Sequence, residues 1–145
     1  MKPRTLEPGD VEAVLALQHD CPELAQWTRS DYERVAQGEM SGWVAEQDGA
    51  LSGFLIARDL RDEIEILNVA VSAPARRQQI GTSLLSAALE WGRVNSARRV
   101  FLEVRKSNQA AISFYEKHGF SAAGRRKRYY NGPIEDAIVL AAEIR

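Results

Sequence analysis

The sequence predicts an α/β fold with one mixed, mostly antiparallel sheet and helices on both of its faces. Strand-like and helix-like segments alternate along the chain in the order strand, two helices, several strands, helix, strand, helix and two strands. An apolar strand at Glu65–Val71 leads through Pro74 into a helical pattern that begins near Gln79. Asp48-Gly49, between two apolar runs, is a strong signal for a hairpin. With 145 residues, the chain is expected to form a single domain over 1–145.

The composition excludes several classes of protein. Hydrophobic residues make up 45% of the chain and charged residues 27%, which is typical of a globular domain. A net charge of −1 argues against nucleic-acid binding through bulk electrostatics. No apolar run is long enough to span a bilayer, and Met1–Arg4 lacks the apolar segment of a secretory signal. Since the single cysteine, Cys21, cannot form an internal disulfide, we expect a cytoplasmic protein without direct contact to membrane or nucleic acid.

The other elements follow from apolar periodicity and from the residues that start and stop helices. Ser30 is expected to cap its helix, because Glu33 follows at the spacing of a capping box. The expected strands are Thr5–Glu7, Trp43–Glu46, Leu51–Arg58, Arg99–Val104, Phe120–Tyr130 and Ala137–Ala142. The expected helices are one capped by Asp10, Ser30–Gln37, Gln79–Val94 and one that begins at Ser107 or Asn108 and ends at Gly119.

The apolar pattern of the central strand slips by one residue. Ile66 lies at one parity of the strand, whereas Leu67, Val69 and Val71 lie at the other. Such a slip indicates a β-bulge, although a strand buried on both faces would carry the same pattern. A bulge, together with the proline that follows the strand, is expected to open the sheet between this strand and the one that ends near Val104.

The loop after the central strand has the features of an anion site. It carries Arg76 and Arg77 and ends with Gly81 at the start of a helix. The free backbone N–H groups of a first helical turn and the helix dipole favour a negative group such as phosphate. A Walker loop is excluded because no lysine follows Gly81, and a Rossmann turn is excluded because its glycine pattern is missing.

Two blocks of sequence resemble the GCN5-related N-acetyltransferase (GNAT) superfamily. The first is the loop, which is similar to the acyl-CoA pyrophosphate loop Gln/Arg-x-x-Gly-x-Gly/Ala, with Gln79 in place of the first glycine. The second lies downstream at a matching separation and consists of Leu102–Arg105, Ser107-Asn108, Ala111, Phe114–Glu116 and Gly119-Phe120. The resemblance is most detailed to the ribosomal-protein-alanine N-acetyltransferases (RimI-like), through Asn68–Val71, Tyr129-Tyr130 and Glu135–Ala137.

This resemblance implies a GNAT fold, acetyl-CoA as cosubstrate, no metal ion, and acetyl transfer to an N-terminal α-amine, such as that of alanine in a ribosomal or other protein. It implies Glu103 as general base and Tyr115 as general acid. The donor would be held by Leu67, Asn68, Val69, Ala70, Val71, Arg76, Arg77, Gln78, Gln79, Ile80, Gly81, Thr82 and Asn108. The peptide entrance would be lined by Trp27, Tyr129 and Tyr130.

The residue types suit this chemistry, but each also has a structural interpretation. A carboxylate can take the ammonium proton, a phenol with a pKa of about 10 can protonate a thiolate, and a bulge N–H can polarise the carbonyl. Glu103 could instead form an ion pair with an arginine such as Arg105. Tyr115 could be an aromatic residue of the core. The basic run Arg125–Arg128 could be a solvated strand, or it could attract an acidic partner. The competing functions are a small-amine or antibiotic acetyltransferase of the same fold and a non-catalytic acyl-CoA-binding module.

Overall fold

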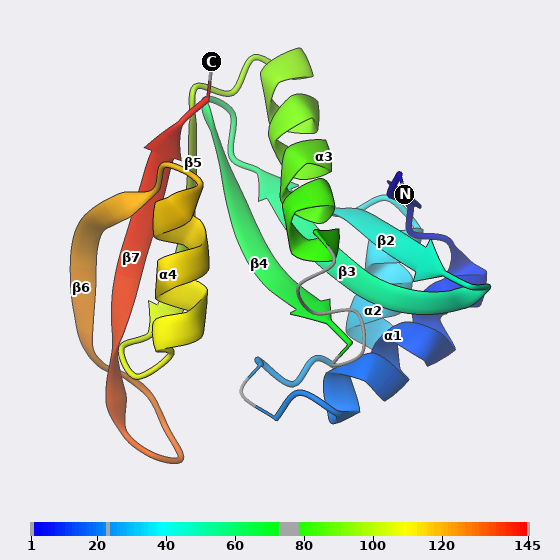
Figure 1. Ribbon diagram of the computed structural model, residues 1–145, viewed down its shortest axis with the longest axis horizontal. Coiled ribbons are helices and arrows are strands. Elements are labelled where there is room, and N and C mark those ends of the chain that lie inside the picture. Colours follow the sequence, from blue (N-terminus) through cyan, green and yellow to red (C-terminus); the bar gives the residue numbers. More distant parts are fainter. Residues whose placement is uncertain (1, 23, 73–78, 145) are drawn as a thin grey trace.

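The sheet of the computed structural model has the strand order β1-β2-β3-β4-β5-β7-β6, in a structure that describes residues 2–22, 24–72 and 79–144. Neighbouring strands run antiparallel except β4 and β5, which run parallel, so the expected mixed sheet is confirmed (Figure 1). The strands are β1 Arg4–Thr5, β2 Ser41–Gln47, β3 Ala50–Asp59, β4 Glu63–Val71, β5 Arg99–Arg105, β6 Ser121–Tyr130 and β7 Glu135–Glu143. The helices are a 3₁₀ turn at Pro8–Asp10, α1 Val11–His19, α2 Arg29–Ala36, α3 Ile80–Val94 and α4 Gln109–Lys117.

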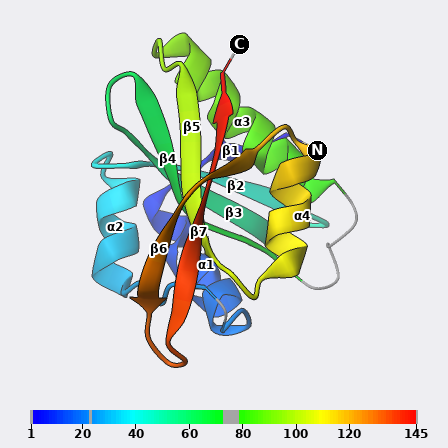
Figure 2. The ribbon, with the colours of Figure 1, turned by 90° about the vertical axis from the view of Figure 1, so that its left-hand side faces the viewer.

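Helices cover both faces of the sheet, as the sequence predicted. Helices α1 and α2 lie on one face, and α3 and α4 lie on the other (Figures 1 and 2). Strand β3 supplies both cores, because alternate side chains point to opposite faces. Phe54 and Ile56 are buried in the cluster under α1 and α2, and Leu55 and Ala57 are buried in the cluster under α3 and α4. The central strands are therefore fixed from both sides.

Strand β4 contains the predicted bulge at Leu67. Its pairing with β3 passes from Ile66 directly to Asn68, so Leu67 is the extra residue. Ile66 before the bulge and Val69 after it both pack toward α3 and α4, whereas Leu67 packs toward α1 and α2. The bulge is therefore the cause of the change in apolar parity along the sequence.

The sheet opens between β4 and β5. Their parallel pairing runs from Glu63 opposite Arg99 to Glu65 opposite Phe101 and does not continue beyond that pair. The two strands diverge from there toward their carboxyl ends (Figure 1). The predicted opening is confirmed, and among the described residues no strand pairs with the edge of β4 that faces β5 from Ile66 to Ala70.

The start of α2 corrects the capping prediction. Thr28, not Ser30, is the N-cap: its hydroxyl accepts the Asp31 N–H at 3.1 Å, and the Asp31 carboxylate accepts the Thr28 N–H at 2.8 Å. Both Thr-x-x-Asp and Ser-x-x-Glu fit the capping-box spacing, and the earlier pair is the one that forms.

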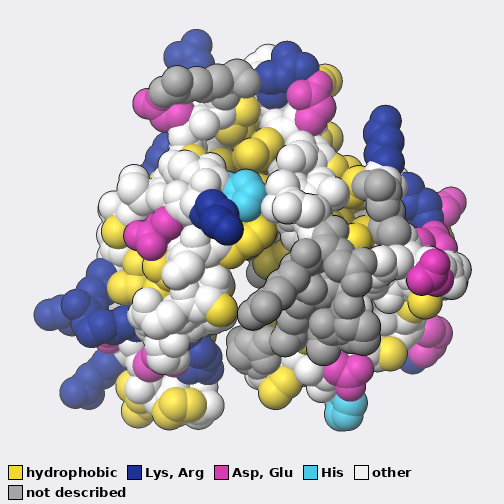
Figure 3. Space-filling model, in the orientation of Figure 1, with side chains coloured by type: hydrophobic (Ala, Val, Ile, Leu, Met, Phe, Trp, Pro, Cys, Tyr) yellow, Lys and Arg dark blue, Asp and Glu magenta, His cyan; other side chains and the backbone are white. Residues whose placement is uncertain are grey.

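Strand β6 forms one edge of the sheet and carries the basic run Arg125–Arg128. The run is exposed, and Lys and Arg side chains gather over this part of the molecule (Figure 3). Two of its charges are paired within the chain, because Arg125 contacts Asp136 and Arg126 contacts Glu103. The strand is therefore solvated but only partly free to attract an acidic partner.

Candidate active site

A cleft of about 420 Å³ lies where the sheet opens. Its walls are the carboxyl half of β4, the end of β5, the start of α4 and the loop after α1. The lining residues are Cys21, Leu24, Ala25, Ile66, Leu67, Asn68, Val69, Ala70, Val71, Gly81, Leu102, Glu103, Val104, Arg105, Asn108, Ala110, Ala111, Phe114, Tyr115 and Tyr130. The bulge and the early end of the β4–β5 ladder thus create the cleft.

The β4 side of the cleft fits the pantetheine arm of a coenzyme A thioester. Residues Leu67–Val71, all predicted to bind the donor, line this side. Backbone amides along the open edge of β4 can pair with the amide groups of an extended arm, much as another strand would. At the far end, Gly81 in the first turn of α3 approaches the Phe114 ring so closely that a Cβ would lie 3.3 Å from it. The first turn of α3, whose N–H groups have no partner within the helix, begins at this end of the cleft and can face an anion.

The remaining part of the predicted loop is only partly described. Arg76, Arg77 and Gln78 lie outside the described residues. Ile80 is buried in the core and serves to anchor α3. Thr82 is tied to α4, since its hydroxyl lies 3.1 Å from Nε2 of His118.

Gln79 adopts a left-handed backbone conformation, with φ of 66° and ψ of 12° at the N-cap of α3. A glycine matters at this place in the loop if the backbone requires positive φ, and the structure meets that condition. The position requires positive φ, which costs a residue with a Cβ roughly 1–2 kcal/mol. This is the physical reason for a glycine at that place in the loop pattern.

Gln79→Gly is therefore expected to stabilise the fold. Glycine relieves the left-handed strain but also raises the conformational entropy of the unfolded chain. The net increase in the free energy of unfolding is roughly 0.5–1 kcal/mol. The free energy of unfolding in urea measures it, with Gln37→Gly as the matched control for added flexibility, because Gln37 at the end of α2 has an ordinary φ of −86°. We still expect the affinity for coenzyme A to change by less than about tenfold, or 1.4 kcal/mol, because the N–H at residue 79 is retained. A loss of stability would contradict the left-handed conformation.

Glu103 lies on β5 in the wall of the cleft. Its side chain is only 11% exposed, and one carboxylate oxygen lies 2.9 Å from Nε of Arg126 on β6. The structural alternative named Arg105 as its partner, but Arg105 pairs with Glu135 at 3.1 Å. The carboxylate is thus ion-paired and still borders the cleft.

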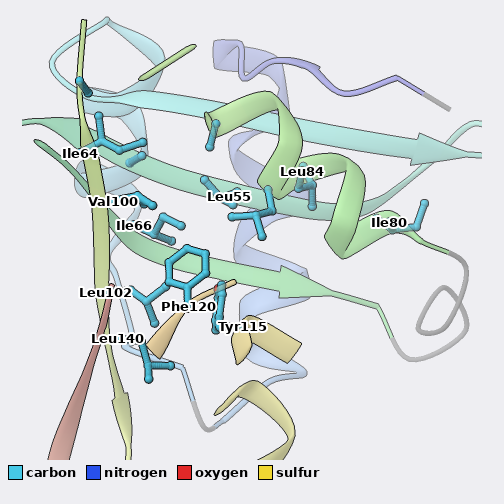
Figure 4. Close-up of a cluster of buried hydrophobic side chains, with 14 of the residues drawn as sticks. Leu55, Ile64, Ile66, Ile80, Leu84, Val100, Leu102, Tyr115, Phe120 and Leu140 are labelled. Carbon is cyan, nitrogen blue, oxygen red and sulfur yellow. The ribbon is translucent and has the colours of Figure 1, made fainter. Parts of the chain in front are cut away.

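Tyr115 joins the hydrophobic core to the cleft. The residue is 3% exposed, and its ring packs against Phe120 at 5.2 Å and Phe114 at 5.1 Å between ring centroids. Figure 4 shows it beside Phe120 in the buried cluster. Burial raises the pKa of the Tyr115 phenol well above its usual value. The hydroxyl is therefore held protonated across the neutral range, so the core and acid interpretations are compatible.

The ends of α4 fix the position of Tyr115. At the start, Asn108 is the N-cap, and its side-chain oxygen accepts the Ala111 N–H at 3.2 Å. At the end, Gly119 has φ of 91°, and the Phe120 N–H donates to the Tyr115 carbonyl at 3.0 Å. These bonds form the helix stop that the sequence predicted. Asn108 also lines the cleft, and its contact with the thiol arm stays a prediction.

The three residues predicted at the peptide entrance separate in the structure. Tyr130 lines the cleft, and burial raises its pKa to about 12. Tyr129 is 48% exposed and lies outside the cleft wall. Trp27 packs inward against Tyr32, with ring centroids 5.4 Å apart, and its loop presents Leu24 and Ala25 to the cleft instead.

A buried hydrogen-bond network, which the sequence reasoning missed, holds that loop against β4. Asn68 donates from Nδ2 to the Tyr32 hydroxyl at 3.0 Å, and Tyr32 donates to Oε1 of Gln18. Gln18 in turn accepts the Trp27 N–H at 3.0 Å and donates to the Trp27 carbonyl at 2.9 Å. A polar residue inside an apolar strand, such as Asn68, is the signal that could have revealed it.

Two kinds of feature do not occur in the described ranges. No group of three or more His, Cys, Asp or Glu side chains within 2–22, 24–72 and 79–144 is arranged to hold a metal ion. No described helix is long and apolar enough to cross a membrane.

Comparison with known proteins finds acetyltransferases similar to this chain in sequence. Residues 11–120 match the model of the acetyltransferase (GNAT) family. The chain is 37% identical over 100 residues to the [ribosomal protein bS18]-alanine N-acetyltransferase of Escherichia coli strain K12, which covers 68% of each chain. It is 34% identical over 125 residues to an N-alpha-acetyltransferase of Sulfurisphaera tokodaii, covering 77% of this chain and 74% of that one.

A solved structure agrees with these sequence matches. The crystal structure of the ribosomal-protein-S18-alanine N-acetyltransferase from Escherichia coli superposes with a TM-score of 0.85 at 28% identity, over 99% of this chain and 93% of the other. The match to the family model spans both the open-edged strand and the Tyr115 helix. The chain belongs to the GNAT family and is an N-acetyltransferase, as the sequence resemblance implied.

Proposed function

We propose that this enzyme transfers the acetyl group of acetyl-CoA to the N-terminal α-amine of a protein, with alanine of ribosomal protein bS18 as substrate. The observation that carries the proposal is the placement of Glu103 and Tyr115 on one cleft beside the open edge of β4. The substrate is suggested by the bS18-alanine N-acetyltransferase that is 37% identical to this chain. A cytoplasmic location is part of the proposal, because ribosomal proteins are made and assembled there.

In this proposal Glu103 makes the amine nucleophilic. A peptide α-amine has a pKa near 8 and arrives mostly as ammonium at neutral pH, about 7. Glu103 takes one proton from it, directly or through water, and leaves a nitrogen lone pair free to attack. When bound, acetyl-CoA supplies the activated acetyl thioester that this nitrogen attacks.

The other side of the cleft serves the carbonyl oxygen and the departing sulfur. Backbone N–H groups at the β4 bulge around Leu67 stabilise the negative charge that develops on the oxygen. Tyr115 gives its proton to the thiolate as the carbon–sulfur bond breaks, and the second proton that the attacking nitrogen loses restores the phenol through water. Burial raises the pKa of Tyr115, but the same low-dielectric surroundings also make a neighbouring thiolate more basic. This higher basicity of the thiolate offsets part of the cost of taking a proton from a phenol with a raised pKa.

The proposed cleft should prefer an α-amine to a lysine side chain. Deprotonating the α-amine at neutral pH costs roughly 3 kcal/mol less, since the pKa values are about 8 and about 10.4. We expect kcat/KM for a free N-terminal alanine peptide to exceed that for the N-acetylated peptide carrying one lysine by at least about tenfold. Equal rates on the two peptides, measured by release of coenzyme A, would contradict the preference.

The substrate is tested by mass spectrometry of ribosomal proteins incubated with the enzyme and acetyl-CoA. An added acetyl group on the first residue of bS18, and not on its lysines, is the expected result. Acetylation of small amines with no reaction on any ribosomal protein would favour the small-amine alternative. Release of coenzyme A with any acceptor would exclude a non-catalytic binding module.

A further inference from the structure

Arg126 reaches Glu103 across the middle strand of the β5–β7–β6 ladder. Glu103 lies opposite Val139 on β7, and Val139 lies opposite Gly124 on β6. Arg126, two residues beyond Gly124, points to the same face of the sheet. Because Gly124 has no side chain, nothing on that position blocks the arginine from extending to the carboxylate, where Nε lies 2.9 Å from Oε1.

A bulge in β6 places an aromatic ring on the same guanidinium. Pairing with β7 shifts between Arg126 and Tyr130, and Arg128 within the bulge has φ of 52°. In a regular strand, residues three apart face opposite sides. Here the Arg126 guanidinium lies over the Tyr129 ring, 5.1 Å from its centroid. The exposed Tyr129 ring can therefore still contact the Arg126 guanidinium by a cation–π interaction when the guanidinium is outside the cleft.

The neighbouring ion pair is held far more firmly. Arg105 pairs with Glu135 and also donates to the carbonyls of Asn131 and Pro133 at 3.1 Å. Glu135 also accepts from the N–H and the hydroxyl of Ser107, each at 2.9 Å. Arg126, in contrast, is held by Glu103 and the Tyr129 ring, and its side chain is 57% exposed. Of the two guanidinium groups, Arg126 is the one that can leave at little cost.

We propose that Arg126 occupies the position on Glu103 that the α-ammonium of the substrate takes, so that substrate binding exchanges one cation for the other. The inference rests on the proposed function, in which Glu103 receives that ammonium. The exchange keeps the carboxylate compensated in both states, since an unpaired charge in a partly buried wall is costly. The acetylated product is a neutral amide and cannot form an ion pair with the Glu103 carboxylate. Arg126 then returns to Glu103 and favours product release, which makes it a specificity-determining residue for a charged amine.

The test is the affinity of Arg126→Ala for a hexapeptide that begins with a free alanine, measured by calorimetry with saturating coenzyme A. Competition predicts tighter binding by about three- to fivefold, since ion pairs between partly exposed groups are worth up to about 1 kcal/mol. Damage to the structure would weaken binding, so the direction of the change separates the two causes. The N-acetylated form of the same peptide has no ammonium and should bind Arg126→Ala and wild type equally.

Two further variants complete the experiment. Lys127→Ala removes an equal charge from the same strand without touching Glu103 and should leave both affinities unchanged. In a Glu103→Gln background, Arg126→Ala should no longer tighten binding. Unchanged or weaker binding of the free-amine peptide to Arg126→Ala, or equal tightening of both peptides, would overturn the proposal. If Glu103→Gln alone keeps its full turnover rate, the proposed base role fails, yet the affinities still decide whether Arg126 and ammonium compete.

Discussion

Glu103→Gln is expected to lower kcat/KM by roughly 10²–10⁴ while the affinity for acetyl-CoA stays unchanged. Glutamine keeps the shape of the side chain and can still accept a hydrogen bond from Arg126, but it cannot take a proton from an ammonium group. The donor side of the cleft is built from β4 and α3, which this substitution does not touch. The loss should therefore fall on the chemical step and on the acceptor, not on donor binding.

Steady-state kinetics on an alanine peptide and titration with coenzyme A separate these effects. Glu65→Gln is a matched control, because Glu65 is also an ion-paired carboxylate, 2.7 Å from Arg58, at the closed end of the β4–β5 pairing. It should keep wild-type kinetics. If Glu103→Gln also keeps them, the proton must leave through a chain of water molecules, or the amine must arrive already neutral.

The opening of the sheet could be read from the sequence because its cause is local. A bulge changes which face each following side chain occupies, so the apolar pattern of the sequence shows the parity shift between Ile66 and Val69. The helix stop at Gly119 and Phe120 is local in the same sense. Each of these features depends on residues within a few positions of one another.

The features that the sequence did not predict depend on competition or on long-range register. Two capping boxes overlap at the start of α2, and local spacing cannot decide between them. The Glu103–Arg126 pair depends on how three strands align across β7, so Arg105 was the obvious but incorrect choice. The strain at Gln79 was missed because a glutamine gives no sign of the left-handed conformation that its position requires.

Tyr115→Phe is expected to lower kcat/KM by a factor similar to that of Glu103→Gln, roughly 10²–10⁴, without unfolding the protein. The ring packing against Phe114 and Phe120 is retained, and only a hydroxyl at the cleft is removed. The loss should shrink when the donor thioester carries a thiol that leaves more easily, because that thiolate needs less help from a proton. Thermal unfolding monitored by circular dichroism provides the check on folding.

The pH dependence gives a second test of the same hydroxyl. Burial raises the pKa of Tyr115 above its usual value of about 10, so the proton-donating form persists to higher pH than in a free tyrosine. In the wild type, kcat/KM should therefore show no alkaline fall from this group below pH of about 10. Tyr130 is the other phenol in the cleft, and Tyr130→Phe distinguishes the two donors. A near-wild-type rate for Tyr115→Phe with a large loss for Tyr130→Phe would move the acid role to Tyr130 and leave Tyr115 as a core aromatic.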